Sequence, residues 1–171
     1  SDTGERMDMA VKLAAMLKNE NGGIESLGGA DVTVISGDNE GEQELGSEVA
    51  QNLVDEGAHV LTGCFSSPVT SAATRVAERE RVPFVISVSI ANSILQETQL
   101  NYVYRPQPSA RRMSTNHAAM MPQVARDGGV DVETAGLFYI DISFGQSVRD
   151  TLRNELPNNG VEIVEETAIG F

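Results

Sequence analysis

The feature that most constrains this chain is its alternation of short apolar segments with longer segments of helical periodicity. Residues 82–86 form a fully apolar run, which is typical of a central strand in a parallel sheet. Further strands are predicted at residues 32–35, 58–61, 102–105, 134–140 and 161–168. Apolar residues recur at helical spacing within residues 9–17, 45–54, 67–77, 109–125 and 146–156. This order predicts an α/β fold with a doubly wound parallel sheet.

Turn and cap residues mark where these helices begin and end. Asn21-Gly22-Gly23 ends the first helix with residues that tolerate left-handed geometry. Ser67-Pro68 opens the third helix, where serine suits the N-cap and proline the first turn. Ser109 is predicted to cap the fourth. Prolines in residues 105–109 stiffen the connection before it, so we expect a first lobe at residues 1–106 and the start of a second at 107–171.

Composition excludes several classes of function. The net charge of −13 argues against nucleic-acid binding, which requires a basic patch. The chain has two lysines and ten arginines. An acidic, lysine-poor composition fits either an ordinary acidic protein or a protein that stays soluble at high salt. No apolar run is long enough to span a bilayer, and no signal-peptide leader is visible. The single cysteine, Cys64, excludes an intrachain disulfide.

Three loops follow predicted strands, at the edge of the sheet where ligands bind in open parallel α/β folds. The first carries Ser66 and Ser67 at a helix start, where unpaired N–H groups attract a carboxylate. The second contains the polar run 87–92, and the third places Phe144 before a predicted helix. Each loop has an ordinary explanation as well: Ser67 as a cap only, 87–92 as a polar turn, and Phe144 as packing within its own domain.

Signals for an enzyme are weak. Cys64 could act as a nucleophile with His59 or His117 as its base. However, His59 lies just before a predicted strand and His117 lies in a helix far along the chain. No histidine or cysteine cluster has the spacing of a metal site, and no glycine-rich phosphate loop is present. We therefore predict no catalytic residues, no metal and no cofactor.

Five segments occur in the order found in a known family. They are residues 14–24 (AAMLKNENGGI), 63–67 (GCFSS), 82–87 (VPFVIS), 102–105 (YVYR) and 139–145 (YIDISFG). Together they resemble the amino-acid family of type I periplasmic binding proteins, best known from leucine/isoleucine/valine uptake. The resemblance covers nearly the whole chain.

The resemblance implies two α/β lobes joined by a hinge, with the ligand in the cleft between them. The family's ligand contacts would fall on Ser67, on Ser89, Ile90 and Ala91, and on Phe144 from the second lobe, with Ser66 as a neighbour. Relatives often have threonine at the position of Ala91 and tyrosine at that of Phe144, so two hydrogen-bonding groups are absent here. We also expect the family's opening strand before Ser1, and the rest of the second lobe, with its ammonium-binding acid, after Phe171.

The function implied is that of an extracytoplasmic solute-binding protein of an ABC transporter, with or without a lipid anchor. Its partners would be a small ligand, an amino acid or amide, and a membrane permease, with the full-length protein a monomer. An extracellular sensor domain of the same fold is the first alternative. A doubly wound α/β enzyme is the second, although no acid/base set converges on the loops.

Overall fold

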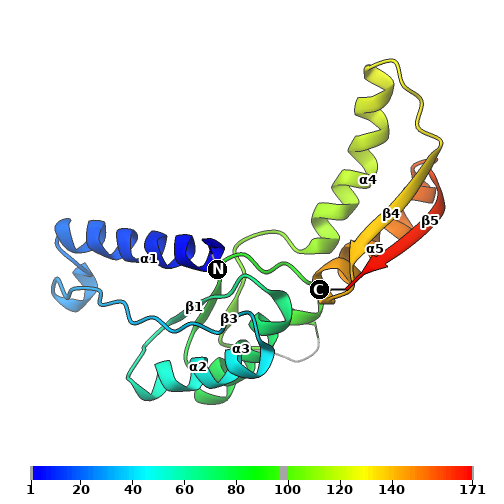
Figure 1. Cartoon of the computed structure of the whole chain (residues 1–171). Helices are drawn as coiled ribbons and strands as arrows, with labels where there is room; N and C mark the ends of the chain where they lie inside the picture. Colours follow the sequence, from blue (N-terminus) through cyan, green and yellow to red (C-terminus); the bar gives the residue numbers. More distant parts are fainter. Residues whose placement is uncertain (1, 97–99, 171) are drawn as a thin grey trace.

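The computed structural model describes residues 2–96 and 100–170, which form an α/β structure (Figure 1). The helices are α1 (Asp2–Glu20), α2 (Gln43–Asp55), α3 (Ser67–Glu80), α4 (Ala110–Asp127) and α5 (Ser143–Asn158), with short 3-10 turns η1 (Glu25–Leu27) and η2 (Ser93–Leu95). The strands are β1 (Leu61–Gly63), β2 (Phe84–Ile86), β3 (Val103–Tyr104), β4 (Thr134–Ile140) and β5 (Glu162–Ile169).

The first sheet has the order β1-β2-β3, and both of its strand pairs are parallel. Its core includes Leu61 of β1, Phe84 and Ile86 of β2, and Val103 of β3. Helix α3 adds Ala73, Val76 and Ala77 to this core, and α2 packs on α3. The apolar residues that recur at helical spacing within 67–77 are predicted to form its buried face, and they are all buried: Val69, Ala72, Ala73, Val76 and Ala77. That prediction is confirmed.

The second sheet consists of β4 and β5, which are parallel and joined by α5. Helix α4 packs against α5, and a small core forms from Ala118 of α4, Leu137 of β4, Leu156 of α5 and Val161. Thr134–Ile140 was predicted as a strand with these bounds and is one. Ser109 accepts a hydrogen bond from the Arg112 amide, so its predicted role as the cap of α4 is confirmed as well.

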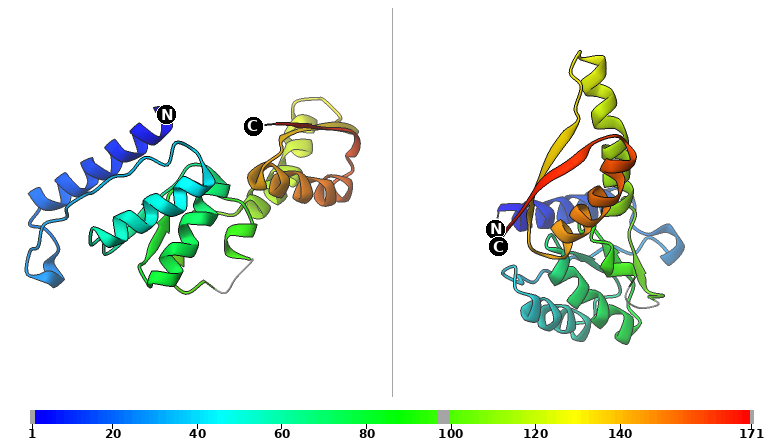
Figure 2. Two further views of the ribbon diagram at one scale, coloured as in Figure 1. Left: turned by 60° about the horizontal axis from the view of Figure 1, so that its bottom comes forward. Right: turned by 90° about the vertical axis from the view of Figure 1, so that its right-hand side faces the viewer.

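Figures 1 and 2 show two groups of elements: β1 to β3 with α2 and α3, and β4, β5 with α4 and α5. Helix α1 stands apart from both groups and has no buried residue. Its apolar stripe is therefore largely in contact with solvent, with Met9 60% and Leu13 52% exposed. Among the described residues, no helix is both long and apolar enough to cross a membrane.

Two strand predictions need correction. Residues 32–35 are not a strand, because they make no ladder with any described strand. Instead, the side chain of Asn19 bonds both the amide and the carbonyl of Val32. The next strand begins at Leu61 and not at Ala58, since the Ala58 amide bonds the Leu53 carbonyl and so belongs to the end of α2. Local apolar character predicted both segments, but a strand also requires a partner.

Two helix starts also differ from their predictions. The N-cap of α3 is Ser66, and Ser67 is already the first helical residue; the Ser66 side chain makes no capping bond. Helix α5 begins at Ser143, before the predicted start at Gln146, because the Gln146 amide bonds the Ile142 carbonyl and closes an earlier turn. Phe144 therefore lies in the first turn of α5 and not in the loop before it.

Candidate ligand-binding site

The first two predicted loops begin side by side at the carboxyl edge of the first sheet. Gly63 ends β1, Ile86 ends β2, and these two residues are paired in the parallel register. The Ser87 amide continues the ladder by donating to the Gly63 carbonyl at 3.0 Å. The loop that leads into α3 and the loop 87–92 consequently leave the sheet together, as expected for parallel strands.

A buried pair of hydroxyl groups joins these loops. Ser89 Oγ lies 2.5 Å from Thr70 Oγ1 in α3, 2.9 Å from the Phe65 carbonyl oxygen and 3.1 Å from that of Cys64. Thr70 Oγ1 is also 2.8 Å from the Ser66 carbonyl oxygen. Since Ser89 is only 2% exposed, its hydroxyl serves to hold one loop against the other.

The second loop is also attached to the connection that leads to α4. The Ser89 carbonyl accepts from Gln107 Nε2 at 3.3 Å, that of Ile90 from the Ala110 amide at 2.8 Å, and that of Ala91 from Arg105 Nη1 at 2.8 Å. Three consecutive carbonyls thus bond to residues 105–110. The loop is therefore held through its main-chain carbonyls as well as through the Ser89 hydroxyl.

Several backbone N–H groups of these loops donate no hydrogen bond. Among the described residues, the amides of Ser67 and Val69 in the first turn of α3 donate to no protein acceptor. The same holds for the amides of Ile90 and Ala91. A helix start and an adjacent loop with free N–H groups together suit an anionic ligand group.

The third loop reaches this region from the second sheet. The Asn92 amide donates to Ser147 Oγ of α5 at 3.1 Å, and Asn92 Oδ1 accepts from the Arg111 amide of α4 at 3.0 Å. Phe144 lies one turn earlier on α5 and remains 38% exposed. Asn92 therefore links the second loop to both helices of the other group of elements.

The structure brings together five of the six predicted site residues. Ser66, Ser67, Ser89, Ile90 and Ala91 lie on the two loops joined by Thr70, with Ser67, Ser89 and Ala91 buried. Phe144 lies on α5, and a hydrogen bond from the Asn92 amide to Ser147 links this helix to the second loop. Sequence reasoning missed Thr70 and Arg105, and it placed Asn92 in the second loop without naming it as a site residue. Only the position of Asn92, directly after Ala91, was a usable signal.

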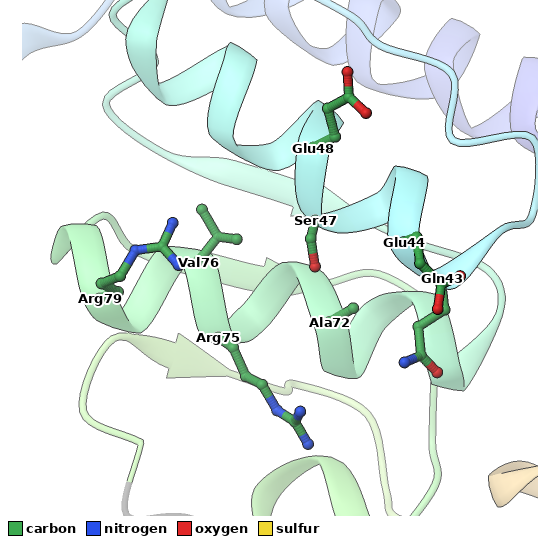
Figure 3. Close-up of a pocket in the computed structure, with 8 residues that line it drawn as sticks. All are labelled: Gln43, Glu44, Ser47, Glu48, Ala72, Arg75, Val76 and Arg79. Atoms are coloured by element: carbon green, nitrogen blue, oxygen red, sulfur yellow. The ribbon is translucent and has the colours of Figure 1, made fainter.

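Neither of two cavities formed by the described residues is lined by the predicted residues. One of about 650 Å³ lies between the two groups, where Asn92, Ser93 and Gln96 face polar residues of α5 such as Ser143, Ser147 and Asp150. The other, of about 530 Å³, lies between α2 and α3 (Figure 3). Figure 3 shows Glu48 and Arg75 pointing away from each other there.

The residues needed for catalysis are not brought together. Burial raises the pKa of Cys64 to about 11, so its thiol is protonated at neutral pH and is a poor nucleophile. His59 and His117 are both exposed, and neither bonds Cys64. Within residues 2–96 and 100–170, no group of His, Cys, Asp or Glu side chains could hold a metal ion.

Comparison with known proteins agrees with this geometry. The family model described as "Periplasmic binding protein" matches residues 1–171. The chain belongs to the periplasmic binding protein family. Among curated members, it is 26% identical over 164 residues to Leu/Ile/Val-binding protein homolog 8 of Brucella abortus (strain 2308), covering 94% of this chain and 40% of the relative. The chain thus spans well under half of that relative's length.

Solved structures of the family share the fold. An ABC transporter substrate-binding protein from Desulfitobacterium hafniense, in complex with Leu, has a TM-score of 0.78 at 21% identity, over 92% of this chain and 44% of that one. A solute-binding protein from R. palustris in complex with benzoate has a TM-score of 0.81 at 17% identity, over 96% and 44%. These matches confirm the predicted type I periplasmic-binding-protein fold. The family and fold are those of binding proteins and not of enzymes, as predicted.

Proposed function

We propose that this chain forms part of an extracytoplasmic substrate-binding protein that captures a small carboxylate-bearing solute for an ABC transporter. The observation that carries the proposal is the pair of joined loops at the carboxyl edge of the first sheet. They place the unused amides of Ser67 and Val69 beside a loop with the unused amides of Ile90 and Ala91. Fixed N–H donors at a helix start favour an anion without needing a basic side chain.

Similar solved structures with bound ligands support a ligand that carries a carboxylate. The structures of similar fold hold Leu, benzoate and 4-hydroxybenzoate, and these three molecules share a carboxylate while differing elsewhere. The proposed ligand residues are Ser66, Ser67, Ser89, Ile90, Ala91 and Phe144, and none of them is acidic. An amino acid would therefore find its ammonium partner on other residues, whereas an aromatic acid would require none. Ser89 would contribute through its backbone, because its hydroxyl is bonded to Thr70.

Capture proceeds by closure of two lobes in this proposal, with residues 1–106 in the first and 107–171 in the second. The carboxylate binds first to the joined loops. Helix α5 then brings Phe144 over the apolar part of the ligand, where the ring excludes water and adds apolar contact. The closed form is what a permease would recognise outside the cytoplasmic membrane. No bond of the ligand is made or broken.

A ligand screen on the complete protein that contains this chain tests the proposal. Leucine, benzoate and 4-hydroxybenzoate are compared in thermal-shift assays with leucinamide and benzamide, which lack the carboxylate. An acid at 100 times its dissociation constant should stabilise the protein by about 2.7 kcal/mol. Stabilisation by an acid and not by its amide is expected. If amides stabilise as well as acids, or if no acid stabilises, the proposed carboxylate site is wrong.

A matched pair of variants tests the site itself. Ser67→Ala removes the hydroxyl at the α3 start and should weaken binding of the preferred acid by more than about tenfold. Ser47→Ala, on α2 beside the other cavity, should leave the affinity unchanged. Titration calorimetry of both variants measures the difference, and an unchanged affinity in Ser67→Ala would exclude the Ser67 hydroxyl, leaving only its amide as a ligand group.

A further inference from the structure

The start of helix α5 has backbone donors that suit an anion. The first hydrogen bond of the helix runs from the Gln146 amide to the Ile142 carbonyl. The amides before it, those of Ser143, Phe144 and Gly145, have no acceptor among the described residues. The start of this 16-residue helix also carries partial positive charge, so an anionic group is favoured there.

The Ser143 side chain is separate evidence for a ligand at this helix start. Its Oγ is buried and makes no hydrogen bond to the described residues. A buried hydroxyl group without a partner is rare in folded proteins, because it has lost its bonds to water and gained none in return. Ser143 also lines the cavity of about 650 Å³ between the two groups of elements. A ligand group in this cavity would supply the missing partner.

Arg111 adds a cation to the same cavity. It lines the cavity, and its guanidinium makes no hydrogen bond or ion pair with the described residues. The base of Arg111 lies near the start of α5, since its amide bonds Asn92 Oδ1 at 3.0 Å and the Asn92 amide bonds Ser147 Oγ at 3.1 Å. An anion at the start of α5 would thus have both helix amides and a free guanidinium available to it.

Two carboxylates also line this cavity, and neither removes that preference. Asp150 is paired with Arg149 at 2.5 Å, so its charge is neutralised locally. Glu155 lies more than three turns beyond Ser143, about 18 Å further along the axis of α5. The cavity therefore has its unpaired acid far from the helix start.

The start of α5 lies close to the loops of the candidate site. Ala91, whose amide has no described acceptor, directly precedes Asn92. The Asn92 amide bonds Ser147 Oγ, and that oxygen lies 2.7 Å from the Ser143 carbonyl oxygen. These contacts place the Ala91 amide and the first turn of α5 on the order of 10 Å apart. A small molecule with an anionic group at each end spans such a distance.

We propose that the start of α5 is a second anion-binding subsite, formed by its free amides, Ser143 Oγ and Arg111, and that the preferred ligand is a dicarboxylate. This inference rests on the proposed function: one carboxylate binds the loops of the first sheet, and the other binds the start of α5. Phe144 lies in the same helical turn, where its ring would pack on the apolar part between the two acids. The subsites belong to different groups of elements, so a ligand that fills both also holds these groups together.

Ligands that differ only in their second acid test the inference without any substitution. Calorimetry on the complete protein that contains this chain compares terephthalate with monomethyl terephthalate, which has a similar shape but one charge. Succinate and monomethyl succinate form the matched aliphatic pair, and benzoate is the simple monoacid. At least one diacid should bind about tenfold more tightly than its monoester, since a second charged group is bound. The inference is overturned if neither diacid exceeds its monoester.

The variants Arg111→Gln and Ser143→Ala test the residues, with Arg112→Gln as the control. Both test variants keep the main-chain amides, and Arg111 is exposed, so its replacement should not disturb the core. Arg112 is an exposed neighbour on α4 that does not line the cavity. Arg111→Gln should weaken binding of the preferred diacid about tenfold and Ser143→Ala about threefold, with a smaller loss for the monoester. Arg112→Gln should bind both ligands as wild type does.

Other results would contradict the second subsite. Unchanged diacid affinity in both test variants removes these residues from it, and equal losses for diacid and monoester show a general structural role. If benzoate binds more tightly when inorganic phosphate is added and no diacid is preferred, the start of α5 takes a separate anion and the ligand is not a dicarboxylate. A wild-type protein that binds no carboxylate refutes the proposed function, whereas one that binds monoacids and diacids alike refutes only this inference.

Discussion

Thr70 Oγ1 and Ser89 Oγ lie 2.5 Å apart in the interior, and this contact joins helix α3 to the loop after β2. Thr70 is fully buried and Ser89 nearly so. The two hydroxyl groups have only two protons between them, but they lie within hydrogen-bonding distance of three carbonyls, those of Cys64, Phe65 and Ser66. The pair therefore holds both loops of the candidate site together, although the residues are 19 apart in the chain.

The first prediction concerns this pair. Ser89→Ala leaves buried acceptors without a donor and should lower the free energy of unfolding by about 1–3 kcal/mol. Thr70→Val should cost a similar amount. Because the residues touch, the double variant should lose less than the sum of the single losses, by at least about 0.5 kcal/mol. Chemical denaturation of the four proteins measures the coupling, and strictly additive losses would show that the contact contributes no stability.

The second prediction concerns the close approach of α5 to the end of β4. A Cβ atom at Gly145 would lie 2.0 Å from the Ile140 carbonyl oxygen, a main-chain atom that cannot move alone. Gly145→Ala should therefore destabilise the protein by about 1–3 kcal/mol. It should also weaken ligand binding, because Phe144 precedes it in the first turn of the helix.

Gly136→Ala is the matched control for that substitution. Gly136 lies in β4, and a Cβ atom there would meet nothing within 4 Å. Alanine restricts the unfolded chain more than glycine does, so this variant should be neutral or stabilised by roughly 0.5–1 kcal/mol. Thermal unfolding of both variants checks the contrast. A Gly145→Ala protein as stable as Gly136→Ala would show that the helix start adjusts freely.

The third prediction is a pH dependence at Glu78. Its carboxylate accepts from the Tyr102 amide at 2.9 Å and the Asn101 amide at 2.8 Å, and so it ties α3 to the segment that enters β3. These bonds, chiefly that from Tyr102, hold the pKa of Glu78 below its ordinary value. The stability that this carboxylate contributes is thus present above the unfolded-state pKa and is lost as pH falls through the lower folded-state pKa.

The measurement is the free energy of unfolding of wild type and Glu78→Gln across the acidic range. The variant should be less stable at neutral pH, and the difference should shrink as the wild-type carboxylate is protonated. Glu48→Gln serves as the control, since the Glu48 side chain is exposed on α2 and makes no hydrogen bond to the described residues. A stability difference at Glu78 that does not vary with pH would contradict the assignment.

The fourth prediction concerns Cys64. Burial raises its pKa to about 11, so little thiolate exists at neutral pH and alkylation by iodoacetamide should be slow in the folded protein. The rate should rise when pH approaches that value, or when denaturant unfolds the chain. Cys64→Ala should bind ligand as wild type does. Rapid labelling of the folded protein at neutral pH would contradict this account.

The secondary structure could be predicted largely from the order of the residues. The five helices and the strands around residues 84–86 and 134–140 follow from apolar periodicity and from caps such as Ser109. These signals are local, since the spacing of apolar residues can be recognised within a short stretch of sequence. The two loops of the candidate site were also found in this way, because parallel strands end at one edge of a sheet.

What the sequence could not supply are the contacts between distant segments. Residues 32–35 have the composition of a strand, yet in the folded chain Val32 bonds Asn19 and no strand. Ser89 carries a hydroxyl suited to a ligand, but that hydroxyl bonds Thr70. The Arg105 side chain bonds the Ala91 carbonyl. A polar group acts through the partner it meets, and that partner is set by how the whole chain folds and not by its neighbours in sequence. The order of the residues thus determined the α/β class and where the loops of the candidate site lie, whereas the folded structure was needed to show which groups on those loops already have hydrogen-bond partners.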